Sequence, residues 1–478
     1  MNFIPAELDR ILRETPVLRR SFLVGGCVRD ALLARPPGPD FDVEVFGVGY
    51  EALAAGLAAW GKTDLVGRSF GVVKLSIGGA FTYDFTIPRR DSKIAPGHKG
   101  FAVEFDPDIT PEQAASRRDF TINSLMYDPR EHWLLDFFGG QADLEHRILR
   151  HTSAAFGEDP LRVLRGMQFA ARFNLTPAPE TIELARRIKS SYAQLPVERV
   201  REEWCKWARL SVTPSLGLKF LRDTEWIDHF PELKATIGVP QEPEWHPEGD
   251  VFVHTCHCCD AMVQLQDWQT ADSDTRVALM LGILTHDFGK PATTHQALRH
   301  GAMRIVSPGH EEAGEPVARA FLQRIGVPIA MENRVAPLVR NHLIHFQDVS
   351  DRLIRRLAKR LEPESIEHLC LIITADSNGR PPRPPSEPEN VKKLLARAHE
   401  LQVRHQPAPP ILMGRHLLEL GLAPGREFRV MLDAAYEAQL EGVFFDLTQA
   451  RRWLAEQEGL PLAADIRERL LIGQKVQQ

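Results

Sequence analysis

The amino-acid sequence changes character once, near Arg147, and this change limits the folds it can adopt. Between Ser21 and Leu144, short runs rich in β-branched and aromatic residues alternate with turns and short helical stretches. After Arg147 the chain consists mainly of long amphipathic stretches with helix caps and few alternating runs. We therefore predict an α+β fold, in which a mixed-sheet N-terminal head is followed by an all-helical remainder.

Two proline-rich segments mark expected boundaries within the helical part. Gln241–Asp250 combines proline with acidic residues, and Arg380–Asn390 has the composition of a stiff, exposed connector. A chain of 478 residues is long enough for two to four domains. We predict four parts, namely a head at 1–145, a helical neck and body at 146–240, a second functional domain at 241–385 and a helical C-terminal region at 386–478.

The composition excludes several classes of protein. Hydrophobic residues make up 43% and charged residues 26%, as in ordinary globular proteins. The longest apolar runs, such as Ala278–Leu284, are too short to span a bilayer, and the N-terminal segment lacks the apolar core of a secretion signal. The six cysteines do not form a disulfide framework, so we expect a reducing, cytoplasmic location. With a net charge of −6, any nucleic-acid partner must bind through local basic surface.

A strand, a glycine turn and a helix start succeed one another from Phe22. Gly25 and Gly26 allow a backbone to approach a phosphate closely, and the N-terminus of the following helix offers free N–H groups. Arg29 adds a fork-shaped cation suited to a triphosphate. A single Gly-Gly pair is also typical of an ordinary tight turn, so a phosphate-binding role needs support from neighbouring motifs.

Two carboxylates separated by one residue come after this turn. Asp40 and Asp42 lie on a predicted strand, where a period of two places both on one face. Such a pair can hold Mg²⁺ together with substrate phosphates, and two such ions activate a 3′-hydroxyl and stabilise departing pyrophosphate. Asp84, on a separate predicted strand, is our preferred third carboxylate. Glu44 shares the face of Asp40 and Asp42, but we interpret it as a solvated strand carboxylate.

Asp159, Arg162 and Arg165 recur at intervals of three residues, which predicts that they share one face of a helix. An aspartate accepts from an exocyclic amine and an arginine donates to a ring nitrogen or carbonyl, so together they can recognise a base edge. A surface ladder of ion pairs is the alternative. Arg117 and Arg118, upstream, are better suited to phosphate or RNA backbone. The segment Asp119–Leu125, directly after them, is expected to open a helix.

These motifs, in this order and at these spacings, closely resemble the class II tRNA nucleotidyltransferases and bacterial poly(A) polymerases. The resemblance is dense from Phe22 to Phe173, looser elsewhere, and is carried by GGCVRD, DFD, RRDFTINSL and EDPLRVLR. It implies that the triphosphate is held by Gly25, Gly26 and Arg29, that Mg²⁺ is held by Asp40 and Asp42, and that the incoming ATP or CTP is bound by Arg118, Asp159, Arg162 and Arg165.

The reaction implied by this resemblance is addition of CCA to the tRNA 3′ end from CTP and ATP, with the protein serving as its own template. Arg89–Thr110 is similar to the flexible loop that the family needs for the switch from CTP to ATP, which favours full CCA addition. A poly(A) polymerase or a partial CC- or A-adding enzyme is the alternative. Cys27 stands where the family usually has alanine, and Glu44 adds a carboxylate.

A second set of chemical groups lies in the helical part. His254, His286, Asp287 and Asp376 come from three predicted helices and make a nitrogen and oxygen site suited to a divalent transition metal, which can activate water for attack on a phosphoester. Their order, with HDFGKP, resembles the HD phosphohydrolase domain. The resemblance implies phosphatase, 2′-nucleotidase and 2′,3′-cyclic phosphodiesterase activities. A protein of another class, an HD phosphohydrolase whose head only binds RNA, is a further alternative.

Other histidines and cysteines lie near this set. His310 and His342 either extend it to a second metal or are unrelated to it, and the sequence leaves both open. Cys256, Cys258 and Cys259 lie in one predicted helix, and no second CxxC completes a zinc site. We interpret these three cysteines as small buried hydrophobic residues.

The expected RNA surface runs along the neck, where a stripe of arginines can contact the phosphates of a tRNA acceptor stem. A solvated helix face is the alternative interpretation. The stripe consists of Arg147, Arg150, Arg162, Arg165, Arg172, Arg186 and Arg187. The C-terminal segment from Ile411 is suited to RNA contact or to dimerisation, and the oligomeric state stays open.

Overall fold

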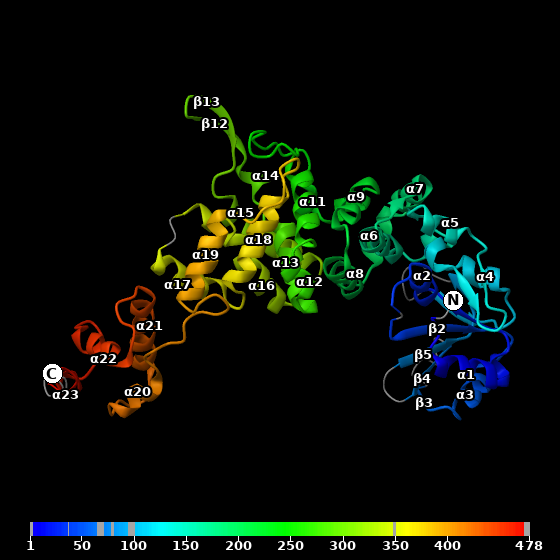
Figure 1. Ribbon diagram of the computed structural model, residues 1–478, viewed down its shortest axis with the longest axis horizontal. Coiled ribbons are helices and arrows are strands. Elements are labelled where there is room, and N and C mark those ends of the chain that lie inside the picture. Colours follow the sequence, from blue (N-terminus) through cyan, green and yellow to red (C-terminus); the bar gives the residue numbers. More distant parts are fainter. Residues whose placement is uncertain are drawn as a thin grey trace. The chain divides into compact units, whose positions relative to one another are not determined.

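The computed structural model describes residues 3–36, 38–64, 71–77, 81–93, 101–347 and 350–472. The chain divides into two compact units (Figure 1). Unit 1 comprises residues 1–234 together with 324–326, and unit 2 comprises residues 235–323 together with 327–478. The finer division into four parts stays a prediction.

Unit 1 is built on a seven-stranded sheet with the order β3-β4-β5-β2-β1-β8-β9 (Figure 1). Strands β2 and β5 run parallel, and the other neighbouring pairs run antiparallel. The predicted α+β class is therefore confirmed. The strands are β1 (Ser21–Val24), β2 (Asp40–Val45), β3 (Lys62–Asp64), β4 (Val72–Ile77), β5 (Phe81–Thr86), β8 (Met126–Asp128) and β9 (Trp133–Leu135).

The apolar core of the sheet lies on one side of β2. Phe41, Val43 and Val45 are buried there in one cluster with leucines of the N-terminal helices. Asp40 and Asp42 alternate with them and are exposed. The period of two in this strand thus separates the groups that hold the fold from the groups available for chemistry.

Helices surround the sheet in unit 1 and continue beyond it. Helix α6 packs against α8 and α9. The helices are α1 (Ala6–Glu14), α2 (Gly26–Leu32), α3 (Tyr50–Leu57), α4 (Pro111–Ser116), α5 (Gly140–Glu145), α6 (Leu161–Phe173), α7 (Pro179–Arg187), α8 (Val197–Leu210), α9 (Pro214–Asp223) and α10 (Pro231–Lys234). Two further short strands, β10 (Ile148–Leu149) and β11 (Thr176–Pro177), pair with each other in parallel.

One predicted helix is wrong. The segment Asp119–Leu125 forms only a short 3₁₀ turn at Thr121–Asn123 and then enters β8. The Asp119 carboxylate accepts hydrogen bonds from the backbone N–H of Phe120 and from the Asn123 side chain. These local bonds give the backbone an alternative to the helical pattern.

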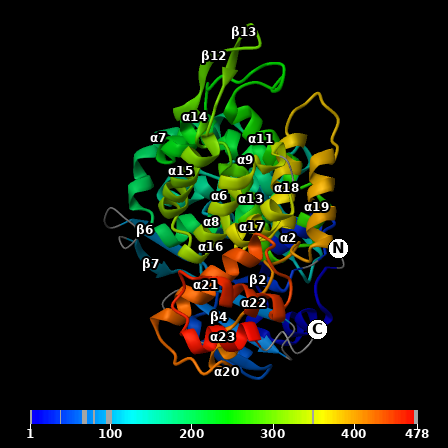
Figure 2. The ribbon, with the colours of Figure 1, turned by 90° about the vertical axis from the view of Figure 1, so that its left-hand side faces the viewer.

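Unit 2 consists mainly of helices, with one exposed hairpin that projects from them (Figure 2). The hairpin comprises β12 (His295–Arg299) and β13 (Ala302–Val306). His295 lies in β12 and His300 in the turn between the two strands, and both are exposed. The helices are α11 (Val251–Met262), α12 (Gln266–Thr270), α13 (Ser273–Thr285), α14 (Lys290–Thr293), α15 (His310–Arg324), α16 (Ile329–Asn341), α17 (Asp351–Leu361), α18 (Ile366–Asn378) and α19 (Glu389–Glu400).

The C-terminal helices of unit 2 have an apolar cluster of their own, formed around Leu417, Met431 and Leu454. They are α20 (Gly414–Glu419), α21 (Arg426–Leu440), α22 (Leu447–Glu456) and α23 (Ala464–Ile472). Among the described residues, no helix has the length and apolar character needed to cross a membrane. The six cysteines, all within the described ranges, form no disulfide.

Candidate functional site

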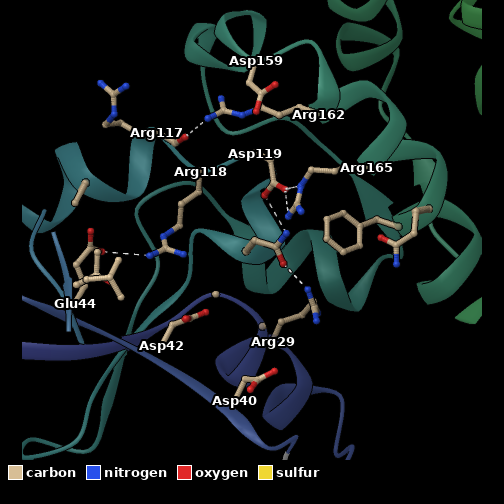
Figure 3. A pocket seen from close by; sticks show the side chains of 18 of the residues that line it. Arg29, Asp40, Asp42, Glu44, Arg117, Arg118, Asp119, Asp159, Arg162 and Arg165 are labelled. Carbon is tan, nitrogen blue, oxygen red and sulfur yellow. Dashed lines mark hydrogen bonds and ion pairs between the residues drawn. The ribbon is translucent and has the colours of Figure 1, made fainter. Parts of the chain in front are cut away.

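A pocket of about 840 Å³ opens in unit 1 between the carboxylate face of β2 and a group of arginines (Figure 3). The arginines come from the turn after α4 and from α6. Nearly all the residues predicted for the head site line this pocket. They are Gly25, Gly26, Arg29, Asp40, Asp42, Arg118, Asp159, Arg162 and Arg165.

The predicted carboxylates occupy two neighbouring strands. Asp42 on β2 lies directly opposite Asp84 on β5 in the parallel register. Although Asp42 is accessible to solvent, partial desolvation by the surrounding protein raises its pKa, an effect that Arg118 opposes and that the charges of Asp84 and Asp40 reinforce. Carboxylates crowded in this way are suited to a divalent cation, because its charge relieves their repulsion. The donor set thus fits Mg²⁺.

Asp84 and Glu44 differ from their expected surroundings. Asp84 forms an ion pair with Lys74 at 3.0 Å and is not among the residues that line the pocket. Glu44 does line it, is only 8% exposed and accepts a hydrogen bond from Nη2 of Arg118 at 3.3 Å. The interpretation of Glu44 as a solvated carboxylate is therefore wrong. Burial beside Arg118 depends on the turn after α4, which lies far away in the sequence.

Gly25 leaves space in the pocket for a ligand to come close to the backbone. Its φ of 71° lies in the left-handed region, and a Cβ atom there would meet Nη1 of Arg118 at 3.1 Å and Oδ2 of Asp42 at 3.7 Å. A side chain at this position would therefore be strained and would crowd the space between cation and carboxylate. The glycine keeps that space open to a ligand.

Arg29 forms a fixed cation in the wall of the pocket. Its Nη1 donates to Oδ1 of Asn123 at 2.6 Å and its Nε to Oδ1 of Asp30 at 2.9 Å. The guanidinium also lies 4.2 Å from the centre of the Phe173 ring. Only 4% of Arg29 is exposed, so its guanidinium contributes a positive charge at a fixed position in the pocket wall.

Asp119, which sequence analysis missed, connects the head to α6. Its Oδ2 accepts from Nε of Arg165 at 2.7 Å, and its Oδ1 accepts from Nδ2 of Asn123 at 2.9 Å. Burial alone would raise the pKa of Asp119, but Arg165 and the donated hydrogen bonds hold it below the ordinary value. The spacing of four residues between Asp119 and Asn123 was the feature of the sequence that could have indicated this hydrogen bond.

The three residues expected to share a helix face do not do so. Arg162 and Arg165 lie on α6, whereas Asp159 precedes that helix and pairs with Arg199 at 3.0 Å. Arg162 donates to two backbone carbonyl oxygens at 2.6 and 2.7 Å. The alternative of a surface ladder is also wrong, because each side chain has its partner on another segment and all three line the pocket.

The expected flexible loop Arg89–Thr110 lies only partly within the described residues, because 94–100 fall outside them. On either side of this gap, β6 (Arg89–Lys93) and β7 (Phe101–Phe105) pair antiparallel.

Part of the predicted arginine stripe faces the pocket. Within the stripe, Arg162, Arg165 and Arg172 line the pocket.

Unit 2 brings the second predicted set together. His254 comes from α11, His286 and Asp287 from the end of α13, and Asp376 from α18. Nε2 of His254 lies 3.1 Å from Oδ1 of Asp376 and 3.6 Å from Oδ2 of Asp287. Nε2 of His286 lies 3.3 Å from the same Oδ2. All four residues are buried.

His310 and His342 join this cluster. Nε2 of His310 lies 3.2 Å from Oδ1 of Asp287 and 3.2 Å from Nε2 of His342. Asp287 also lies within 3.6 Å of both His254 and His286. Among the described residues three groups of donor atoms occur here, and within each group these atoms lie no more than 4.8 Å apart. The groups are His254, Cys258, His286 and Asp376; His246, Glu248 and His254; and Asp287, His310 and His342.

Backbone carbonyls determine which nitrogen of three rings carries the proton. Nδ1 of His286, His310 and His342 each lies 2.6–2.8 Å from the carbonyl oxygen three residues earlier. A carbonyl can only accept, so each Nδ1 is the donor, and a ring in its neutral form then presents the Nε2 lone pair to the cluster. Burial, with the neighbouring His286 and His310, lowers the pKa of His342 to about 3. Two facing lone pairs fit a cation between them.

Several charged groups around the cluster were not predicted from the sequence. Oε1 of the buried Glu248 lies 2.7 Å from Nδ1 of His254, and Nζ of Lys290 lies 2.7 Å from Oδ2 of Asp287. Arg380 pairs with Asp376 at 2.8 Å. Lys290 is the lysine of the HDFGKP motif, so its place near the cluster could have been predicted from the sequence. Glu248 lies in the segment that we interpreted only as a domain boundary.

The cysteines of α11 are buried as expected, but one has a further neighbour. Sγ of Cys258 lies 3.3 Å from Nε2 of His254 and belongs to the first donor group. Cys256 and Cys259 belong to none of these groups among the described residues. The hydrophobic interpretation is therefore incomplete for Cys258.

Comparisons with known proteins match the head domain and most of the length of the chain. Residues 21–150 match the family model described as the poly A polymerase head domain. The multifunctional CCA protein of Stenotrophomonas maltophilia strain K279a is 37% identical over 371 residues, which cover 75% of this chain and 86% of that protein. That of Xanthomonas campestris pv. campestris strain B100 is 37% identical over 375 residues, covering 75% and 85%.

Solved structures show the same fold. The Bacillus stearothermophilus CCA-adding enzyme in complex with CTP superposes with a TM-score of 0.59 at 19% identity, covering 99% of both chains. The Thermotoga maritima CCA-adding enzyme complexed with tRNA superposes with a TM-score of 0.56 at 16% identity, covering 99% of this chain and 97% of that one. The fold, together with the relatives at 37% identity, shows that the chain belongs to the class II CCA-adding enzymes, within the family of multifunctional CCA proteins.

Proposed function

We propose that the protein is a nucleotidyltransferase that adds CCA to the 3′ end of tRNA from CTP and ATP, in the pocket of unit 1. The observation that carries the proposal is the placement of Asp40 and Asp42 opposite Arg118 and the arginines of α6, around a space large enough for a nucleotide. The relatives named as multifunctional CCA proteins, and the CCA-adding enzymes solved with CTP, ATP and tRNA, support the same activity.

The carboxylates and the glycine turn would handle the triphosphate end. Asp40 and Asp42 would hold Mg²⁺, which when bound neutralises phosphate charge and activates the attacking hydroxyl. Gly25 and Gly26 leave room for the phosphates beside Arg118. Asp84, on the neighbouring strand, is the proposed third carboxylate and adds to the negative field at Asp42.

The far side of the pocket would recognise the base. Asp159 and Arg162 offer an acceptor and a set of donors, as a pairing base does. Asp119 and Arg199 fix the positions of Arg165 and Asp159 through ion pairs. This preorganised edge would allow the protein to select CTP and ATP without a nucleic-acid template.

The test uses a tRNA that lacks CCA, with Mg²⁺ and labelled CTP, ATP or both, and resolves products at single-nucleotide length. We expect two cytidines with CTP alone and one further adenosine with both nucleotides. Asp42→Ala should abolish extension, whereas the surface variant Asp9→Ala should extend normally. Long adenosine tails with ATP alone would indicate a poly(A) polymerase. If the native protein does not extend, or if Asp42→Ala affects only RNA binding, the proposal is wrong.

We also infer that unit 2 is a metal-dependent phosphohydrolase of the HD type. His254, His286, Asp287 and Asp376 would hold a divalent transition metal, as their mutual distances of 3.1–3.6 Å allow. His310 and His342 would hold a second one together with Asp287. Such metals, when bound, supply an activated water and charge for a phosphoester. The inward Nε2 lone pairs support this inference, and Lys290 and Arg380 orient the two aspartates.

Hydrolysis of 2′,3′-cyclic nucleotides, 2′-AMP and p-nitrophenyl phosphate, measured across a panel of divalent metals, tests the second activity. His286→Ala should abolish hydrolysis of whichever compound the native protein cleaves, and His295→Ala on the exposed hairpin should not. Equal rates in both variants would exclude the cluster as the active site. We place both activities in the cytoplasm, where cysteines without disulfides are the usual state.

A further inference from the structure

His254 differs from the other histidines of the proposed metal site in how its ring is held. The other three rings donate from Nδ1 to backbone carbonyls at helix ends. His254 lies inside α11, where the carbonyl oxygen three residues earlier, that of Val251, accepts from Oγ1 of Thr255 at 2.8 Å. The helix thus uses this carbonyl itself, and the ring of His254 has its partner outside α11.

Glu248 supplies that partner from the segment before α11. Its Oε1 lies 2.7 Å from Nδ1 of His254 and 2.9 Å from Nδ1 of His246, and its side chain is 0% exposed. An ionised carboxylate only accepts, so both imidazole nitrogens donate to the same oxygen. With Nδ1 as the donor, the neutral ring of His254 presents the lone pair of Nε2 on its other side.

The Nε2 side of this ring faces the aspartates of the site. Nε2 of His254 lies 3.1 Å from Oδ1 of Asp376 and 3.6 Å from Oδ2 of Asp287. The two nitrogens of an imidazole point in divergent directions, so a cation bound by Nε2 and these aspartates is out of reach of the carboxylate at Nδ1. Glu248 is therefore placed to act on the metal through His254 and not as a ligand.

Hydrogen bonds fix the segment of Glu248 against α11. Asp250 caps the helix and also accepts from the backbone N–H of Gly238 at 2.7 Å. Gly249, between Glu248 and Asp250, has a φ of 127°, a backbone conformation that only glycine adopts without strain. Its carbonyl oxygen accepts from Nε2 of Gln241 at 3.3 Å. The carboxylate thus has a defined position at the start of α11.

We propose that Glu248 is a positioning residue of the metal site in unit 2, which fixes the ring of His254 with Nε2 directed at the metal. The proposal rests on the metal-dependent activity inferred for that unit and adds the residue that orients one of its ligands. A carboxylate behind a metal-bound imidazole fixes the ring and raises the basicity of the ligand. Glu248 thus strengthens metal binding without contacting the metal.

Cobalt affinity of the full-length protein, freed of metal and titrated against a chromophoric chelator, measures the effect. All proteins carry Asp42→Ala, so that the carboxylates of unit 1 do not compete for cobalt. We expect Glu248→Ala to weaken binding about 10–100-fold. Glu248→Asp, which keeps the charge but withdraws the oxygen from the ring, should do the same. Glu248→Gln should lose less, because its amide oxygen still accepts from both rings, although without charge.

Glu244→Ala is the matched control. Glu244 lies in the same segment, is exposed and pairs with Arg304 on the hairpin. Because it contacts no histidine of the site, this variant should bind cobalt with unchanged affinity.

Nuclear magnetic resonance of the cobalt-loaded proteins separates orientation from a general loss of structure. Co²⁺ shifts the N–H signals of the imidazoles that bind it out of the ordinary range, and an N–H that loses its acceptor exchanges with water and disappears. We expect Glu248→Ala and Glu248→Asp to lose one such signal, that of Nδ1–H of His254, and to keep those of the rings held by backbone carbonyls. Glu248→Gln should keep every signal.

The outcomes distinguish the positioning role from the metal site itself. Unchanged affinity and a complete set of N–H signals in Glu248→Ala would overturn the positioning role and leave the metal site standing. Equal losses of affinity in Glu248→Ala and Glu248→Gln, with every signal retained, would overturn it too, because charge alone would then matter. No cobalt bound by the unsubstituted site would overturn both proposals. Circular dichroism checks folding, and Glu248→Asp decides by the same two measurements if Glu248→Ala does not fold.

Discussion

At the scale of single residues, the head site depends on charges that are neutralised by distant parts of the chain. The negative charge of Asp119 is balanced by Arg165 on α6, and that of Glu44 by Arg118 after α4. Each pair fixes one arginine at the edge of the pocket. The positions of the cations therefore depend on carboxylates that do not themselves have to touch a ligand.

Asp119→Asn is expected to destabilise the protein by about 3 kcal/mol at neutral pH, because removing one partner of a largely buried pair leaves the other charge uncompensated. The pKa of Asp119 is lowered in the folded state, so its contribution is complete above the ordinary aspartate value of 3.8 and is lost as pH falls through the lower folded pKa. The loss in Asp119→Asn should therefore shrink at acidic pH.

Urea unfolding of the full chain at neutral pH, and again below pH 3.8, measures this difference. Asp9→Asn, which removes an exposed pair with Arg13, is the control and should cost only about 0.3–0.5 kcal/mol. A loss for Asp119→Asn that is equal at both pH values would contradict the assignment.

The predictability of each site residue depends on the range of its interactions. The shared face of Asp40 and Asp42 is a property of one strand, so a period of two was enough to predict it. The burial of Glu44 and the pairing of Asp84 with Lys74 depend on how β4, β5 and the turn after α4 come together. Those contacts link segments that carry no shared pattern in the sequence.

At the scale of elements, the predicted helix at Asp119–Leu125 is wrong because side chains there form hydrogen bonds with the nearby backbone. The predicted helices that carry His254 and His286 are present as α11 and α13. Periodicity did not predict that Asp119 would replace a helix by a turn. It also did not show which face of α11 meets α18, and so Cys258 was grouped with the other buried cysteines.

The contact between the end of α13 and the start of α15 leads to an element-scale prediction. A Cβ atom on Gly289 would meet the backbone oxygen of His310 at 2.0 Å and the backbone N of Gly314 at 2.6 Å. Gly289→Ala must therefore shift α15 and with it His310. We expect metal content of unit 2 to fall and hydrolysis to drop at least tenfold, because displacements near 1 Å in an active site can cost about 100-fold.

Gly425→Ala is the matched control, since nothing lies within 4 Å of that position and its φ is ordinary. Metal analysis and hydrolysis rates of both variants check the prediction. Native metal content in Gly289→Ala would show that the backbone of α15 yields without moving His310.

At the scale of the whole molecule, two compact units each contain a complete set of chemical groups. The pocket residues all lie in unit 1, and the donor groups lie in unit 2. Each unit also has apolar clusters of its own. The chain thus has the organisation expected if each unit carries one of the two proposed activities.

This organisation predicts that the two activities can be removed separately. Asp42→Ala should lose CCA addition and keep native rates of phosphoester hydrolysis, and His286→Ala should do the reverse. Each protein is assayed for both reactions under the same conditions. A change of more than a few-fold in the activity of the unsubstituted unit would contradict independent sites and reveal coupling between them.

The backbone carbonyls that accept from His286, His310 and His342 determine how the site responds to substitution of its neighbours. A carbonyl group is present whatever residue occupies the position, so no substitution at Ile283, Ser307 or Val339 can delete the bond that orients each ring. The orientation of each ring therefore depends on the backbone at the end of its helix and not on a neighbouring side chain. The proposed metal site is therefore less sensitive to mutation of the side chains around it, because such changes leave the orientation of the three imidazole rings unchanged.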